Sequence, residues 1–124
     1  MSTRSVIGIV NEDGTIICIY CHNDGYPEGV GAMLKNNYTE ETKIRNLLAL
    51  GDISCLGKGI LLEEGTRAYG RDRGEQGTVA QKYLNERRLM RVARNNYDAE
   101  YVYLWEQGGW KIIIPATKRA QGIY

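Results

Sequence analysis

The sequence lacks long apolar runs and lacks the features of an export signal. Its apolar runs are short, as from Ile112 to Ile114 before Pro115, whereas a membrane-spanning helix needs roughly 18 apolar residues in a row. The first residues, Met1 to Arg4, lead straight into a strand-like pattern without the charged, apolar and small-residue regions of a secretory signal. We therefore expect a cytoplasmic protein with no membrane segment.

Histidine and cysteine are scarce. The chain has one histidine and three cysteines, Cys18, Cys21 and Cys55. An odd number of cysteines without an export signal argues against a disulfide framework. One histidine leaves no second pair of ligands at zinc-finger spacing. We expect reduced thiols, no metal site and no cofactor.

Charge of one sign is not in excess. The net charge is only +1, which argues against indiscriminate binding to nucleic acid, so a nucleic-acid partner is possible but not favoured. The charge is unevenly placed, because residues 79–124 contain eight Lys or Arg and four Asp or Glu, whereas residues 1–50 contain four and six. The C-terminal third is therefore the basic part of the chain.

Local patterns predict two β-hairpins. Asp13-Gly14 is a strong turn signal between two runs rich in Ile and Val. The second of these runs has apolar residues on both faces, which is typical of a central strand. Near the C-terminus, a Gln-Gly-Gly sequence separates two further strand-like runs. The expected hairpins are Ser5–Val10 with Thr15–His22, and Glu100–Glu106 with Trp110–Ile114.

Three helices are expected between the hairpins. Pro27 suits the first turn of a helix that extends to Tyr38, Thr39 is the expected N-cap of a second helix that stops at Gly51, and Asn85 is the expected N-cap of a third. We expect a turn at 52–57, a short strand at 67–71, a strand rather than the start of a long helix at 78–83, and a flexible tail at 116–124. The patterns predict one α+β domain over residues 1–124, with a small antiparallel sheet of about four to six strands and about three helices.

The segment around His22 suggests a cofactor site or a catalytic thiol. Cys18, Cys21 and His22 have the C-x-x-C-H spacing of haem attachment, but a strand directs the two thiols to opposite faces, so we interpret them as core residues. A nucleophilic set of Cys21, His22 and Asp24 meets the same objection, because neighbours on a strand face opposite sides. A histidine that ends a strand and bonds to the following turn is the simpler interpretation.

The loop from Asp24 to Gly31 resembles an anion site at a helix N-terminus. Asp24 and Glu28 would repel an anion there, and a structural explanation suffices: Gly25 supplies a positive φ, Pro27 starts the helix, and Gly29 and Gly31 allow close packing on the sheet. A ligand or partner contact remains the alternative. Its candidate residues are His22, Asp24, Tyr26 and Glu28.

Two arginine-rich segments are candidate contact surfaces. The loop Arg71, Asp72, Arg73, Gly74, Glu75 could clamp a phosphate or form a salt-bridged turn whose charges satisfy one another.

The second arginine-rich segment is the third predicted helix, which carries Arg87, Arg88, Arg91 and Arg94. Arg87, Arg91 and Arg94 recur at helical spacing on one face, which could meet phosphates or an acidic protein surface. A merely solvated face is the alternative. Tyr101, Tyr103 and Trp105 share a strand face that is more typical of core than of a binding platform.

Five segments together give the chain a distinctive pattern: Met1–Ser5, Tyr20–Gly31, Leu50–Ser54, Arg71–Glu75, and Glu100–Tyr103 followed by Trp110. In these segments the chain resembles a family of small proteins encoded by bacteriophages and prophages. The resemblance covers most of the chain and implies an origin more than a reaction. Small phage accessory proteins commonly act against host defences, either by binding a defence protein or by capturing its nucleotide signal.

Three functional hypotheses follow. The first is a non-enzymatic phage or prophage protein, an anti-CRISPR or similar inhibitor, that binds a host defence protein through the arginine helix and the 71–75 loop. The second is sequestration of a cyclic or ADP-ribose-type nucleotide by Arg71, Arg73, Arg91 and an aromatic residue, in a pocket formed within one subunit or between the subunits of a homo-oligomer. The third is a small thiol or acid/base enzyme that uses Cys21, His22 and Asp24.

Overall fold

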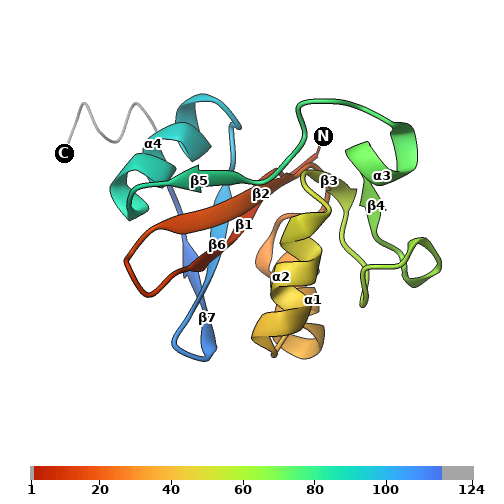
Figure 1. Ribbon diagram of the computed structural model, residues 1–124, viewed down its shortest axis with the longest axis horizontal. Helices are drawn as coiled ribbons and strands as arrows, with labels where there is room; N and C mark the ends of the chain where they lie inside the picture. The colour runs from red at the N-terminus through yellow and green to blue at the C-terminus, as the bar shows by residue number, and fades with distance from the viewer. Residues whose placement is uncertain (1, 116–124) are drawn as a thin grey trace.

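The structure, a computed structural model, describes residues 2–115. The elements are, in order, β1 Ser5–Val10, β2 Ile16–Cys21, the π-helical turn η1 Pro27–Gly31, α1 Ala32–Asn37, α2 Glu41–Ala49, β3 Ile53–Cys55, the 3-10 turn η2 Leu62–Glu64, β4 Arg67–Ala68, α3 Tyr69–Arg73, β5 Gln81–Tyr83, α4 Glu86–Asn95, β6 Tyr101–Glu106 and β7 Gly109–Ile113. The two hairpins lie side by side in the sheet, with α1, α2 and α3 toward one end of the molecule and α4 at the other (Figure 1).

The strands form one open, seven-stranded sheet in the order β4-β3-β2-β1-β6-β7, with β5 also paired to β2. The predicted α+β class is confirmed. The sheet is mixed rather than purely antiparallel, since β1 pairs with β6, and β2 with β3, in parallel. Both β3 and β6 follow a helix that crosses the sheet, and a strand that returns after such a crossing can pair in parallel.

Both faces of the central strands are buried, as their apolar character on both sides predicts. One face, with Ile7, Ile19 and Tyr103, packs against η1, α1 and α2. The other face, with Val6 and Leu104, packs against Leu89 and Ala93 of α4. Figure 1 accordingly shows α4 on the opposite side of the sheet from α1 and α2. The sheet therefore lies between two helical layers, and within residues 2–115 α4 is the helix that covers its second face.

Both hairpins and the third helix agree with the sequence predictions. Gly14 has a positive φ of 87° in the first turn, and the second hairpin closes through Gln107 and Gly108, which both have positive φ. Strand β5 precedes α4, and Asn85 is the N-cap, since its Oδ1 accepts a hydrogen bond of 3.0 Å from the backbone N–H of Arg88. The helix face of Leu89 and Ala93 is buried.

Four local predictions need correction or cannot be compared. Residues 52–57, expected as a turn, contain strand β3, and the strand expected at 67–71 ends at Ala68, where α3 begins. The second helix starts at Glu41 with Glu40 rather than Thr39 as N-cap. The tail predicted at 116–124 lies outside the described residues.

No helix within residues 2–115 is long and apolar enough to cross a membrane.

Candidate functional site

The loop after β2 is held in place by the sheet. Asp24, not Gly25, has the positive φ, at 57°, so that prediction is corrected. Gly25 is required for space, because a Cβ there would lie 2.7 Å from the Cβ of Ser5. The buried hydroxyl of Tyr103 donates a 2.7 Å hydrogen bond to the carbonyl oxygen of Gly25. The loop therefore depends on contacts from β1 and β6, which lie far from it in sequence.

The two helical glycines have different roles. A Cβ at Gly31 would lie 3.2 Å from the ring of Tyr103, so Gly31 does allow close packing on the sheet. A Cβ at Gly29 would instead meet the carbonyl oxygen of Asp24 at 2.4 Å. Gly29 is therefore needed for the fold of the loop itself, not for the approach of the helix to the sheet.

The thiol, imidazole and carboxylate of the catalytic hypothesis are not assembled. Cys21 is buried in the core on the α2 side, and burial raises the pKa of its thiol to about 12. His22 lies on the opposite face, where its Nδ1 is 2.7 Å from the hydroxyl of Tyr20. The expected bond from the histidine ring to the following turn is replaced by this contact with tyrosine. Burial likewise raises the pKa of Cys18 to about 12.

No group of three or more His, Cys, Asp or Glu side chains among the described residues could hold a metal ion.

Asp24, Tyr26 and Glu28 come together, but without His22. They line a shallow hollow of about 340 Å³ beside α1. The hydroxyl of Tyr26 donates to Oδ1 of Asp24 at 3.3 Å, and the carboxylates of Asp24 and Glu28 raise the pKa of that tyrosine. The hollow is acidic, so it cannot serve as the anion site that the loop pattern suggested.

The segment expected as a loop at 71–75 begins with the last three residues of helix α3, so Arg71 lies on a short helix; its side chain is bound within this region. Its guanidinium donates to the carbonyl oxygens of Ile60 and Thr66 and pairs with Asp72, with Nε 2.9 Å from Oδ1. Asp72 in turn accepts the backbone N–H of Ala68 at 2.7 Å. The hydrogen bond from Arg71, and after it the one from the Ala68 backbone, lowers the pKa of Asp72.

The remaining pair of this loop, Arg73 and Glu75, is solvent-exposed. The guanidinium of Arg73 lies 3.9 Å from the Glu75 carboxylate and 5.1 Å from the ring centre of Tyr69. The 71–75 loop thus has the arrangement of a turn whose charges satisfy one another, one of the two interpretations that its sequence allowed.

The arginines of α4 point outward. Arg87, Arg91 and Arg94 line one hollow of about 510 Å³, and Arg88 does not. The helical spacing therefore identified the shared face correctly. The hollow also contains apolar side chains from α4, from the end of β7 and from the two residues that follow β7. We call it the arginine hollow and define it by Arg87, Met90, Arg91, Arg94, Ile113, Ile114 and Pro115.

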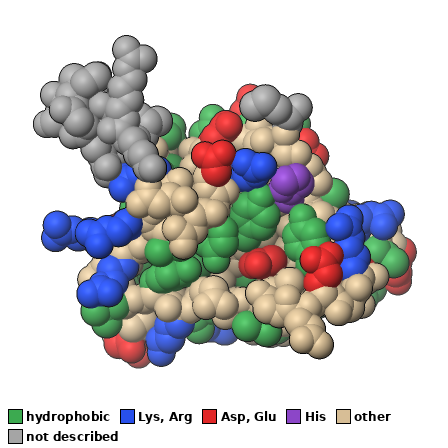
Figure 2. Space-filling model, turned by 90° about the horizontal axis from the view of Figure 1, so that it is seen from above, with side chains coloured by type: hydrophobic (Ala, Val, Ile, Leu, Met, Phe, Trp, Pro, Cys, Tyr) green, Lys and Arg blue, Asp and Glu red, His purple; other side chains and the backbone are tan. Residues whose placement is uncertain are grey.

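The surface near α4 is basic. Figure 2 shows several Lys and Arg side chains together at the left of the molecule, where Figure 1 places α4. Within residues 2–115, neither Arg87 nor Arg91 forms an ion pair. Glu86, the acidic residue at the start of the helix, lies 3.4 Å from Lys111 of β7. The arginine hollow therefore has positive charge that this part of the chain does not neutralise.

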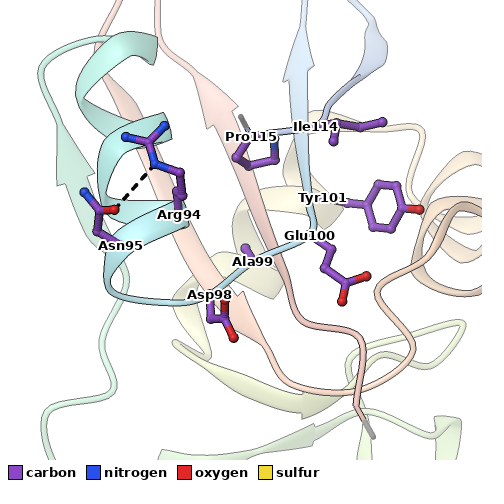
Figure 3. A pocket seen from close by; sticks show the side chains of 8 residues that line it. All are labelled: Arg94, Asn95, Asp98, Ala99, Glu100, Tyr101, Ile114 and Pro115. Atoms are coloured by element: carbon purple, nitrogen blue, oxygen red, sulfur yellow. Dashed lines mark hydrogen bonds between the residues drawn. The ribbon is translucent and has the colours of Figure 1, made fainter. Parts of the chain in front are cut away.

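A second cavity, of about 550 Å³, adjoins the arginine hollow at Arg94. Arg94 and Asn95 extend from the end of α4 on one side, and Tyr101 and Ile114 lie on the other (Figure 3). Nε of Arg94 donates to Oδ1 of Asn95 at 3.4 Å. Asp98 and Glu100 also line this cavity, so its charge is mixed. The basic character is therefore concentrated in the arginine hollow.

Sequence reasoning missed an apolar groove between α1 and the second hairpin. It has a volume of about 660 Å³. Trp105 and Trp110 meet edge to face at 5.4 Å, and the indole N–H of Trp110 donates to the carbonyl oxygen of Tyr38 at 2.7 Å. Ile112, also in the groove, is 47% exposed. We call it the aromatic groove and define it by Tyr103, Trp105, Trp110, Ile112 and Lys35.

The aromatic groove could not be found from strand alternation. Alternation correctly placed Tyr103 and Trp105 in the core, where they are 3% and 8% exposed. The groove lies between the η1–α1 segment and the hairpin of β6 with the edge strand β7, and no local pattern indicates which strand lies at the edge of a sheet.

A half-buried carboxylate on the α4 side was also missed. Asp52 accepts the backbone N–H of Tyr20 at 2.9 Å, in the gap between β3 and β5, which pair with different parts of β2. Burial raises the pKa of the Asp52 carboxyl. On the same side of the sheet, the ring of Tyr97 stacks on that of Tyr20 with 5.4 Å between the ring centres. Asp52 therefore replaces a missing strand contact, a structural role.

Comparison of the chain with protein-family models, with curated proteins and with solved structures finds no match in any of the three.

Proposed function

We propose that the protein is a non-enzymatic binding protein that inhibits an acidic partner protein by docking the arginine hollow of α4 on it. The observation that supports this most directly is that three arginines of one helix face line a single hollow whose lining, within residues 2–115, includes no acidic residue. Arginine and methionine are enriched at protein interfaces, and charged residues surrounding an apolar centre favour a specific docking orientation.

The phage resemblance suggests what the partner is. A small phage or prophage protein that binds without catalysis would act on a component of the bacterial host's defence, as an anti-CRISPR or similar inhibitor does. In this proposal the contact surface is centred on the arginine hollow. The 71–75 loop is left out of it because Arg71 and Asp72 already bind one another and neighbouring backbone atoms.

The nucleotide and enzyme hypotheses receive less support from the geometry. Figure 1 places α3, with Arg71 and Arg73, at the opposite end of the molecule from α4 and Arg91, so one molecule does not bring these arginines into a single pocket. The hypothetical catalytic set fails to meet because Cys21 and His22 lie on opposite faces of the sheet.

The proposal is tested by charge reversal with a matched control on the same helix. Arg87→Glu/Arg91→Glu reverses the hollow, whereas Arg88→Glu makes a similar change outside it. Tagged versions of the wild type and both variants are expressed in a bacterial host that has an active defence system against a phage. The host proteins bound to each version are recovered by affinity purification, and the plaques that the phage forms on that host are counted.

We expect the wild type and Arg88→Glu to restore phage plating and to recover the same acidic host protein. The double variant should lose both effects, because each reversed charge opposes the partner's carboxylates. Equal plating and recovery with the double variant would exclude the arginine hollow as the contact. Recovery of no host protein by intact wild type would contradict the binding function itself.

A further inference from the structure

Strand β7 is the one edge strand of ordinary length among the described residues. The sheet's other edge strand, β4, has two residues, and β5, which pairs beside β3 on β2, has three. Strand β7 has five residues, Gly109–Ile113, and only one neighbour, β6. An edge of this length exposes a row of backbone groups on which another strand can pair.

The register of the hairpin identifies those backbone groups. Gln107 and Gly108 form a two-residue turn, so the flanking pair, Glu106 with Gly109, is hydrogen-bonded. Because hydrogen-bonded and non-hydrogen-bonded pairs alternate, Trp110 and Ile112 direct their N–H and C=O groups away from β6. These are the groups that a further strand would use.

The two faces beside this edge differ in chemistry. Trp110 and Ile112 lie opposite Trp105 and Tyr103 and share their face, which is the aromatic groove. The opposite face carries Lys111 and Ile113, and leads to the arginine hollow. A strand added to β7 would therefore place alternate side chains against an aromatic surface and a basic surface.

We infer that β7 binds an extended segment of the partner protein, in which acidic and apolar residues alternate, as an added strand. The acidic side chains face Arg87 and Arg91, and the apolar side chains lie against Trp110 and Ile112. Main-chain hydrogen bonds to β7 supply affinity and the alternating side chains supply specificity, as in other cases of strand addition. This inference rests on the proposed function and names the form of its partner.

Charge argues against the two occupants that this chain could itself supply. In an antiparallel pairing of two copies about the centre of β7, Lys111 would lie opposite Lys111, and like charges directly opposite are destabilising. The chain's own residues 116–124 contain Lys118 and Arg119 and no acidic side chain. Neither complements the arginine hollow.

The acidic groups nearest to the edge are already engaged. Lys111 lies 3.4 Å from Glu86 and 3.3 Å from Glu106. These two carboxylates neutralise Lys111, and leave Arg87 and Arg91 for the partner. A segment with acidic residues on one face thus finds, on the α4 side, two arginines that form no ion pair within residues 2–115.

The inference is tested with two synthetic peptides of identical composition and about six residues, the usual strand length. One alternates glutamate and valine, and the other groups the glutamates at one end. Binding to the full chain is measured by titration, and hydrogen exchange of the Trp110 and Ile112 amides is followed by NMR. The alternating peptide should bind at least about tenfold more tightly and slow exchange at both amides about tenfold or more.

A proline variant checks the edge independently of the peptides. Ile112→Pro removes an outward N–H. It should abolish the slowing of hydrogen exchange at the Trp110 amide by the alternating peptide and weaken binding of that peptide about tenfold or more. Ile112→Thr, which keeps the N–H, is the control for loss of the isoleucine side chain. Thermal melting shows whether both variants are folded. If Ile112→Pro does not fold, the comparison of the two peptides on the unmodified chain tests strand addition by itself.

The outcomes separate this inference from the proposed function. Equal binding of both peptides without protection of the β7 amides would overturn strand addition and leave an arginine hollow that recognises charge alone. Tighter binding of the alternating peptide that is unchanged by Arg87→Glu/Arg91→Glu would overturn the assignment of the acidic side chains to α4. Binding of neither peptide would overturn strand addition, and the host-protein recovery above would still test the proposed function.

Discussion

Two arginine-rich segments of this protein hold their arginine side chains differently. In the 71–75 loop, Arg71 binds Asp72 and two carbonyl oxygens of the preceding loop. On α4, Arg87 and Arg91 extend from the helix into the arginine hollow. The difference comes from the neighbouring backbone: a loop has carbonyl groups without partners, whereas the carbonyl groups of a helix are bonded within it.

This contrast indicates how to interpret basic clusters generally. An arginine near irregular backbone can satisfy that backbone, and its charge is then unavailable to a partner. An arginine whose side chain reaches no such irregular backbone has no such use, so its charge either meets solvent or meets a partner. Stability measurements on the two segments can therefore test whether the functional division between them is real.

The largest expected effect on stability is at Thr66, the residue on which the loop before Arg71 depends. Its hydroxyl accepts the N–H of Gly57 at 2.9 Å and donates to the carbonyl oxygen of Gly59 at 2.6 Å, and the side chain is fully buried. Thr66→Val leaves both backbone groups without partners and should lower the free energy of unfolding by about 3 kcal/mol, measured by urea denaturation. The exposed Thr39→Val is the control, and an equal loss there would contradict this account.

Arg71→Ala should have the next largest effect. It removes the hydrogen bonds to Ile60 and Thr66 and leaves Asp72, whose side chain is only 17% exposed, without its ion-pair partner. We expect a loss of about 1 to 2 kcal/mol in the free energy of unfolding. Arg73→Ala, in which an exposed and longer ion pair is lost, should cost less than about 0.5 kcal/mol. Similar losses for both would mean that Arg71 has no special structural role.

Much of the fold could be predicted because it depends on local patterns. The two turns, the N-cap Asn85 and the buried face of α4 all follow from residues within a few positions of one another. The three-residue strand β3 and the parallel pairing of β1 with β6 could not be predicted, because they depend on contacts between segments far apart in the chain.

The candidate site divides in the same way. Helical spacing was enough to place Arg87, Arg91 and Arg94 together. The role of Arg71 was not predictable, because carbonyl oxygens of Ile60 and Thr66 belong to the backbone and leave no signal in the sequence. The aromatic groove depends on which strand lies at the edge of the sheet, and that is a property of the whole fold.

A smaller effect is expected on the pH dependence of stability, through the carboxylate of Asp72. Hydrogen bonds, first from Arg71 and then from the backbone of Ala68, lower the pKa of Asp72 in the folded state below the ordinary value of an aspartate. Its contribution to stability is therefore complete above about pH 4 and is lost as pH falls through the lowered pKa. Asp72→Asn should flatten the loss of stability on acidification, followed by thermal melting between neutral and strongly acidic pH. Glu12→Gln, an exposed change of the same charge, is the control, and equal flattening by both would remove the special role of Asp72.

The smallest expected effect is on α4, where Arg87→Ala/Arg91→Ala should change the free energy of unfolding by less than about 0.5 kcal/mol. Both side chains are exposed, neither pairs with an acid within residues 2–115, and alanine is an equally good helix former. Urea denaturation of this variant beside Arg71→Ala compares the two segments directly. A loss as large as that of Arg71→Ala would show that the α4 arginines also stabilise the fold, and the division between a structural and a docking segment would fail. If the variant keeps the free energy of unfolding but no longer recovers the host protein, the two arginines serve binding and not folding. Their positions on the helix are then determined by the partner, because the stability of the fold does not depend on them.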